Sequence, residues 1–232
     1  MRGMRLAAAL VATVVLAACG GDGESAAPTT TSTTPSPVQL DKQRAQRAVL
    51  SLADLPGYTE DAPDPDDEDQ AVASADECVE ANALLLRLGE DDDPRGAASA
   101  DFGREAHTVS SSVTFAETDE EARQAIAVLN RGATITCLST ALTEELRATP
   151  GFTNVRVTSS KLPGVTAGDE NVGYRLVTRG TAAGQAVTIN LEFTFVRVGR
   201  GVSVLQSVSE TSTFPAADRA RLLGLIAGRL AA

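Results

Sequence analysis

The sequence is poor in the side chains that most often build ligand sites. Its 232 residues include no tryptophan, two tyrosines, six phenylalanines and a single histidine, His107. So few aromatic rings offer little surface on which sugars or bases could stack, which argues against carbohydrate binding. One histidine and three cysteines without a CxxC pair do not supply the ligands of a structural metal site. We therefore expect no metal and no cofactor.

Signatures of catalysis are scarce as well. The chain has no G-x-S-x-G nucleophile elbow, since "GVSVL" at 201–205 lacks the second glycine. A Ser-His-acid site built on His107 stays open as an alternative, because triad partners need not be close in sequence. A single histidine in a strand is more often structural. We therefore predict that the protein is not an enzyme and has no catalytic residue. An envelope hydrolase is the third candidate function.

The N-terminal apolar run is too short to cross a bilayer. Arg2 and Arg5 precede the thirteen apolar or small residues 6–18, and a polar Gly-Gly-Asp-Gly-Glu stretch follows Cys19. A membrane span needs about 20 apolar residues, whereas a basic start followed by a short apolar run is typical of a signal peptide.

The end of this run, Leu16-Ala17-Ala18-Cys19, resembles the bacterial lipobox. The resemblance implies that residues 1–18 are a lipoprotein signal peptide and that Cys19 is the lipidation site. It also implies a location at the extracytoplasmic face of the cell membrane, with the membrane as a partner through the anchor. The alternative is an ordinary signal peptide in which Cys19 is incidental.

A change in composition separates a linker from a domain. Residues 19–38 are rich in Gly, Ser, Thr and Pro and cannot bury enough surface to fold, so we expect a flexible linker. Residues 39–232 have the length of a single domain. Without residues 1–18 the chain keeps 18 basic and 31 acidic residues, a formal charge of −13. So negative a surface argues against nucleic acid as a partner.

Two clusters of carboxylates, at 60–69 and 90–93, read as solvated loops. Asp64–Asp69 has acids at alternate positions, as a calcium loop does, but it lacks the glycine at position six. Calcium binding, or an acidic patch for a basic partner protein, remains an open alternative for these loops.

The two cysteines that remain after the anchor, Cys78 and Cys137, predict a disulfide. In an exported protein a lone pair of cysteines is most simply oxidised. Closing a separation of 59 residues would stabilise the fold by about 4 kcal/mol in the chain-entropy model.

Periodicity and capping signals predict the elements. Asp41 is a plausible N-cap for a helix over 41–53, and a second helix is expected over 74–89. Residues 107–115 alternate as a strand. Thr118-x-x-Glu121 forms a capping box for a helical region that Asn130-Arg131-Gly132 divides in two. Four strands are expected over 152–160, 170–180, 185–199 and 201–210, and a final helix begins at Thr213.

The strand over 185–199 predicts a sheet with one packed and one polar face. The apolar residues Val187 to Phe195 alternate with Thr188, Asn190, Glu192 and Thr194. The sequence therefore predicts an α+β fold, with an antiparallel sheet of about five strands, helices packed on one face, and the order ααβααββββα.

This layout resembles known actinobacterial domains. A strand, a helix pair carrying a cysteine, a meander whose third strand runs into "FVRVGRGVSVL", and a last helix are similar to sensor-like lipoproteins and to the extracellular domains of mycobacterial receptor serine/threonine kinases. Those domains hold a helix cysteine in a disulfide, which matches Cys137, but they have a second disulfide that is absent here.

The resemblance implies a non-catalytic, sensor-like domain that binds an envelope protein or a small apolar ligand. A carrier of apolar lipids in the cell envelope is the second candidate function. A carrier would need a cavity lined by apolar side chains that do not pack on one another.

Overall fold

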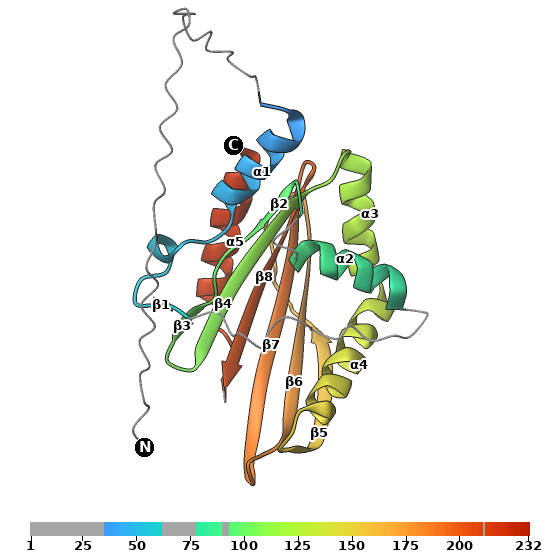
Figure 1. The fold of residues 1–232 in the computed structure, drawn as a ribbon, viewed down its shortest axis with the longest axis vertical. Helices are drawn as coiled ribbons and strands as arrows, with labels where there is room; N and C mark the ends of the chain where they lie inside the picture. The colour runs from blue at the N-terminus through green and yellow to red at the C-terminus, as the bar shows by residue number, and fades with distance from the viewer. Residues whose placement is uncertain (1–34, 62–77, 90–92, 211) are drawn as a thin grey trace, which may run out of the picture. The chain divides into compact units, whose positions relative to one another are not determined.

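A single antiparallel sheet organises the part of the chain that the structure describes (Figure 1). The structure is a computed structural model, and it describes residues 35–61, 78–89, 93–210 and 212–232. The sheet has eight strands in the order β1-β3-β4-β8-β7-β6-β5, and β2 pairs with β4 beside β3. The strands are β1 (Thr59–Glu60), β2 (Gly96–Ala98), β3 (Phe102–Arg104), β4 (His107–Phe115), β5 (Phe152–Lys161), β6 (Glu170–Ala182), β7 (Gln185–Val198) and β8 (Gly201–Glu210).

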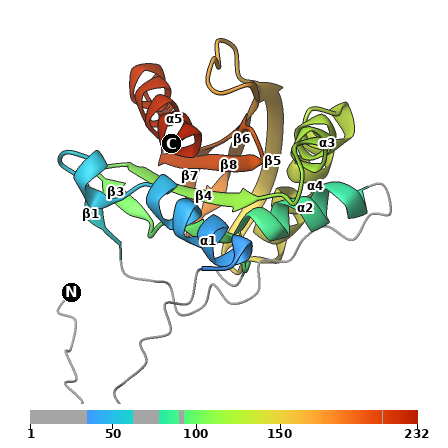
Figure 2. The same cartoon turned by 90° about the horizontal axis from the view of Figure 1, so that it is seen from above.

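Helices cover both faces of this sheet. In Figure 2, α5 lies to one side of the strands, while α2, α3 and α4 gather on the other. The helices are α1 (Pro37–Ala48), the short 3-10 helix η1 (Leu52–Asp54), α2 (Val79–Gly89), α3 (Asp119–Leu129), α4 (Gly132–Ala148) and α5 (Ala216–Ala231). We call the two sides of the sheet the α5 face and the α3 face.

Alternation along the strands supplies a separate core to each face. On the α5 face, Val113, Val196 and Leu205 pack against α1 and α5 through Ala45 and Leu222. On the α3 face, the other side of the same strands packs against α2, α3 and α4; this core is formed by Leu88, Ala122, Ile126, Leu129, Val172, Tyr174, Leu176, Phe195 and Val202. Because successive side chains of a strand point to opposite faces, one set of strands serves both cores.

Two predictions about the architecture are wrong. The sheet has eight strands rather than about five, and helices lie on both faces rather than on one. The three strands that the sequence did not reveal, β1, β2 and β3, have two or three residues each. Strands this short show no periodicity, and they form because β3 and β4 offer them an edge to pair with.

The longer elements match their sequence signals. The strand predicted over residues 107–115 is β4, and the last four predicted strands are β5 to β8. Thr118 caps α3 with the predicted box, its hydroxyl accepting from the N–H of Glu121. The chain then bends by 64° between α3 and α4, at the predicted break.

The first helix begins earlier than the sequence indicated. Ser36, not Asp41, is its N-cap: its hydroxyl accepts from the N–H of Gln39, and Pro37 occupies the first turn. Asp41 lies inside α1 and is 2% exposed. Its carboxylate accepts hydrogen bonds from Arg95, before β2, and from Arg200, in the turn between β7 and β8. An ion pair, rather than a helix cap, is the role of this aspartate.

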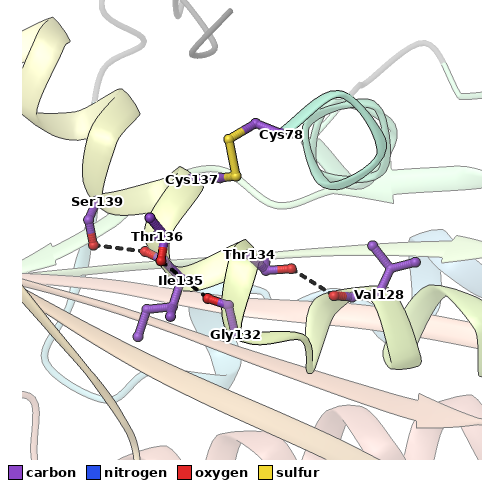
Figure 3. Close-up of a disulfide and its surroundings, with 8 residues drawn as sticks. All are labelled: Cys78, Val128, Gly132, Thr134, Ile135, Thr136, Cys137 and Ser139. Atoms are coloured by element: carbon purple, nitrogen blue, oxygen red, sulfur yellow. Dashed lines mark hydrogen bonds between the residues drawn. A yellow bond between two sulfur atoms is a disulfide. The ribbon is translucent and has the colours of Figure 1, made fainter. Parts of the chain in front are cut away.

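The disulfide joins the helices of the α3 face. Cys78, directly before α2, bonds to Cys137 in the first half of α4, with 5.5 Å between the two Cα atoms (Figure 3). Near this bond, the hydroxyl of Thr134 donates to the carbonyl of Val128 at 2.7 Å and ties α4 back to α3 across the bend. Both cysteines are 2% exposed, so the link is part of the packed structure.

Removing the disulfide should destabilise the domain. We expect the Cys78→Ser, Cys137→Ser double variant to lose about 4 kcal/mol of unfolding free energy, because its unfolded state is no longer held in a closed loop. Urea denaturation of the oxidised protein measures the loss. Reduced wild type is the control and should unfold at the same urea concentration as the variant; a wild type insensitive to reductant would contradict the prediction.

Acid should weaken the attachment of α1 and of η1. Burial alone would raise the pKa of Asp41, but the hydrogen bonds and charges of Arg200 and Arg95 lower it below its ordinary value of 3.8. Burial would also raise the pKa of Asp54. Hydrogen bonds from Arg229 and Ser51 outweigh burial, so the pKa of Asp54 is lowered as well.

A lowered pKa in the folded state means that both groups stabilise the fold above the ordinary pKa, and that this contribution disappears as the pH falls through the lowered value. We therefore expect the unfolding free energy to decrease below about pH 4. Asp41→Asn should remove about 2 kcal/mol at pH 7 and flatten the decrease. Urea titrations between pH 2 and 7 test this, and an equally steep decrease in the variant would contradict it.

Candidate functional site

The α5 face carries a row of polar side chains beneath α5. Asn190, Glu192 and Thr194 of β7 are at most 5% exposed, and Ser207 of β8, the cross-strand partner of Glu192, is also buried. The sequence predicted that this row would be the open polar face of the sheet. That prediction is wrong, because α5 packs over β7 and β8 and removes the row from solvent.

Glu192 is the centre of this row, and two arginines neutralise it. One carboxylate oxygen accepts from Arg219 of α5 at 2.6 Å, and the other accepts from Arg175 of β6 at 2.7 Å. Nearby, the amide of Asn190 donates to the carbonyl of Ser212 at 2.8 Å. A buried carboxylate is tolerated when charged donors satisfy both of its oxygens. The cluster therefore holds the start of α5 against β6 and β7.

His107 lies at the end of the same face and contacts a serine. Its Nδ1 is 2.7 Å from the hydroxyl oxygen of Ser209, and its ring meets the ring of Phe214 edge-on at 5.9 Å between centroids. Ser209 is 1% exposed. Within the residues that the structure describes, no carboxylate lies within ion-pair distance of the imidazole. The pair thus joins β4, β8 and the segment before α5, and it does not form a Ser-His-acid arrangement.

An open groove lies on the other face, between α4 and β5. It has a volume of about 360 Å³ and is lined by Thr136, Ser139, Thr140, Thr143, Glu144, Arg147 and Ser159. Three of these hydroxyls donate to carbonyls of their own helix, as Ser139 does to Ile135 at 2.8 Å, and so present oxygen lone pairs outward. The groove can accept and donate hydrogen bonds, and polar and apolar atoms line it in similar measure.

The part of the α5 face on β5 and β6 is not covered by a helix. Arg156 and Arg179 are directly opposite each other in the ladder, and both are exposed. By the alternation of the strands, their side chains share the face of Arg175 and Glu192. The exposed hydroxyl residues Thr158 and Ser160 continue this face along β5. Together these residues form a polar, cationic surface beside the buried carboxylate.

The two acidic clusters lie mostly outside the described residues, which include Glu60, Asp61 and Asp93. Asp93 is 8% exposed, so it is not part of a solvated loop as predicted. Its carboxylate accepts from the hydroxyl of Thr114 and from the N–H of Arg95, and it shapes the turn before β2. No group of three His, Cys, Asp or Glu side chains in the described ranges could hold a metal ion.

The predicted lipidation site, Cys19, and residues 1–34 around it lie outside the described residues. In the part that is described, no individual helix has both the length and the hydropathy of a membrane span; α3 and α4 reach these values only when taken together. Of the predicted site residues, the structure therefore places Cys78 and Cys137, and it joins them as expected.

Comparison with known proteins finds weak similarity. No protein-family model matches the chain, and no curated protein matches it. Among solved structures, the extracellular domain of PknH from Mycobacterium tuberculosis is similar with a TM-score of 0.42 and 12% identity, over 82% of this chain and 94% of that one. It belongs to the group of kinase domains that the layout resembles. A similarity of this size does not extend to function.

Sequence reasoning missed the roles of Glu192 and of the exposed arginines. One available signal was Arg219, which occurs at helical spacing with Leu222, Leu223 and Ile226, the apolar side of α5. A charged residue on the buried side of a helix requires a buried partner of opposite sign. The facing strand offered Glu192 for this role.

Breaking the buried cluster should be costly. We expect Glu192→Gln to lower the free energy of unfolding by about 3–5 kcal/mol, because two arginines would lose their counter-charge in a buried site. The exposed pair of Glu120 and Arg123 on α3 provides the control, and Glu120→Gln should change stability by less than about 1 kcal/mol. Urea denaturation at pH 7 measures both; similar effects of the two substitutions would contradict the prediction.

Proposed function

We propose that the chain is a lipid-anchored extracytoplasmic protein, with a domain that binds a polar ligand or an envelope protein and does not catalyse a reaction. Acylation of Cys19 would hold the domain at the outer side of the cytoplasmic membrane. Residues 20–34 would act as a spacer, with a relaxed reach of roughly 20 Å. This proposal extends the signal-peptide pattern and the lipobox resemblance to the whole molecule.

The disulfide is the observation that supports the proposed location most directly. Cys78 and Cys137 form a disulfide in the domain, and the one other cysteine of the chain, Cys19, belongs to the lipobox-like segment. Disulfides of this structural kind persist outside the reducing cytosol. An exported module with an acylated first residue accounts for all three cysteines of the chain.

The surface of the domain supports binding of polar groups. The groove between α4 and β5 is lined by hydroxyls and by Glu144 and Arg147, and the uncovered end of the α5 face is cationic. Between the helices and the sheet, the described apolar side chains pack against one another in two cores. These features favour a polar ligand or protein over the apolar lipid that a carrier would hold.

The contact between half-buried His107 and buried Ser209 supports a binding role over hydrolysis. A serine nucleophile must reach its substrate, whereas the hydroxyl of Ser209 is buried and faces the histidine from an adjacent strand. We therefore assign both residues to the packing between β4, β8 and the start of α5.

Metabolic labelling tests the anchor. Cells that express the full chain with an alkyne-tagged palmitate should yield a labelled protein in the membrane fraction, and Cys19→Ser should remove the label. In the same cells, Cys78 and Cys137 should resist thiol alkylation until a reductant is added, because they are oxidised after export. An unlabelled wild type, or freely alkylated cysteines, would contradict the proposal.

A further inference from the structure

β5 is the last strand of the sheet and leaves one edge without a partner strand. It pairs with β6 on one side, and no other described strand pairs with it. The register is irregular between Thr153 and Arg156, where Asn154 has a φ of 56°, and is regular over Arg156–Lys161. A strand edge of this length without a partner strand is a template for pairing with another chain.

The ladder indicates which backbone groups of β5 point outward. The N–H of Leu162 donates to the carbonyl of Gly173 at 2.8 Å, and pairing continues without interruption from there to Arg156 opposite Arg179. Inward and outward groups alternate along an antiparallel strand. The N–H and C=O groups of Val157, Ser159 and Lys161 therefore point away from β6, where they can accept an added strand.

The charges beside this edge are unusual for the protein. Among the arginines whose side chains the structure describes, three form no ion pair or hydrogen bond with described residues: Arg147, Arg156 and Arg179. All three belong to α4, β5 or β6. Acidic residues outnumber basic ones by 31 to 20 in this chain, so arginines without carboxylate partners at one place stand out.

The placement of Arg156 opposite Arg179 has a physical cost. Like charges directly across a ladder repel each other and destabilise a sheet by a few tenths of a kcal/mol. The one carboxylate on the same face nearby, Glu192, is engaged by Arg175 and Arg219. An external anion would relieve the repulsion, and it would meet no competing acid on this face of β5 or β6.

We propose that β5 is the docking site of an extended, acidic segment of a partner protein, which adds to the sheet as a ninth strand. Its backbone would pair with Val157, Ser159 and Lys161. The carboxylates of the added strand that lie on the α5 face would be beside Arg156. Arg179, two strands away, would be about 10 Å from the backbone of the added strand, a distance that an arginine and a glutamate side chain span together. The proposal rests on the binding role proposed above and names the chemistry of the partner.

Charge complementarity selects this occupant over a second copy of the chain. Two copies paired through their β5 edges would place Arg156 and Arg179 of both chains on one continuous face of the joined sheet, and these like charges would repel. An acidic strand is favoured because its charge is opposite to that of the arginines. Successive side chains of a strand point to opposite faces, so every second residue of the added strand lies on the α5 face.

A binding titration tests the proposal. The full chain, purified from whole cells in a nonionic detergent, is titrated against a fluorescein-labelled octapeptide of alternating Thr and Glu, and fluorescence anisotropy is recorded at low salt. We expect saturable binding that weakens with added salt. The matching Thr and Gln peptide should bind on the order of tenfold more weakly.

Two pairs of variants separate the charges of the edge from net charge. Arg156→Ala with Arg179→Ala should weaken binding by about five- to tenfold. The matched control, Arg47→Ala with Arg123→Ala, removes the same charge from exposed positions on α1 and α3 and should leave binding unchanged. Equal weakening in both double variants would overturn the proposal in favour of nonspecific attraction.

The backbone contacts have a test of their own. Ser159→Pro removes an outward N–H without removing a bond to β6, and it should abolish peptide binding, whereas Ser159→Ala should retain it. Hydrogen exchange on wild type should show the amides of Val157, Ser159 and Lys161 slowed by the Thr and Glu peptide, and this readout does not depend on folding of the proline variant.

Three results would overturn the proposal: no saturable binding, binding that survives in Ser159→Pro with unchanged exchange at β5, or a dimer of the full chain that the arginine double variant dissolves. The last result would assign the edge to self-association. None of these depends on acylation of Cys19, so failure here and failure of the anchor are distinguished by the labelling experiment.

Discussion

The buried carboxylate of Glu192 is the interaction on which the arrangement of this domain depends. It lies in the middle of a polar row on β7 that could not be covered by an apolar helix without large desolvation costs. Arg219 from α5 and Arg175 from β6 satisfy both of its oxygens, so the row can be buried. The helix is thereby held over β7 and β8, and the sheet acquires a second core.

The position of α5 also determines which surface stays open. Because α5 packs on β7 and β8, the same face of β5 and β6 has no helix above it, and Arg156 and Arg179 remain exposed there. On the opposite face, α4 runs along β5 and a polar groove lies between them. Exposed polar surface therefore lies on both sides of the edge strand β5, and it is the basis of the binding role that we propose.

Much of the local structure could be predicted from the sequence because its signals are local. The capping box at Thr118, the break near Gly132 and the alternation of β4 act within a few residues and do not depend on distant partners. The strands β2 and β3 had no such signal. Their residues look like a polar loop, and their conformation is imposed by the neighbouring edge of β4.

The sequence by itself determined the pairing of Cys78 with Cys137 and the order and type of the longer elements. The number of strands, the covering of both faces, the burial of Asp41, Asp93 and Glu192, and the open edge at β5 were decided only by the tertiary structure. The physical reason is that the cost of burying a charged side chain depends on partners far away in the chain. Glu192 and Arg219 are 27 residues apart, and Asp41 and Arg200 are 159 apart. Alternation along a strand distinguishes two faces, but it does not specify which of them a later helix will cover.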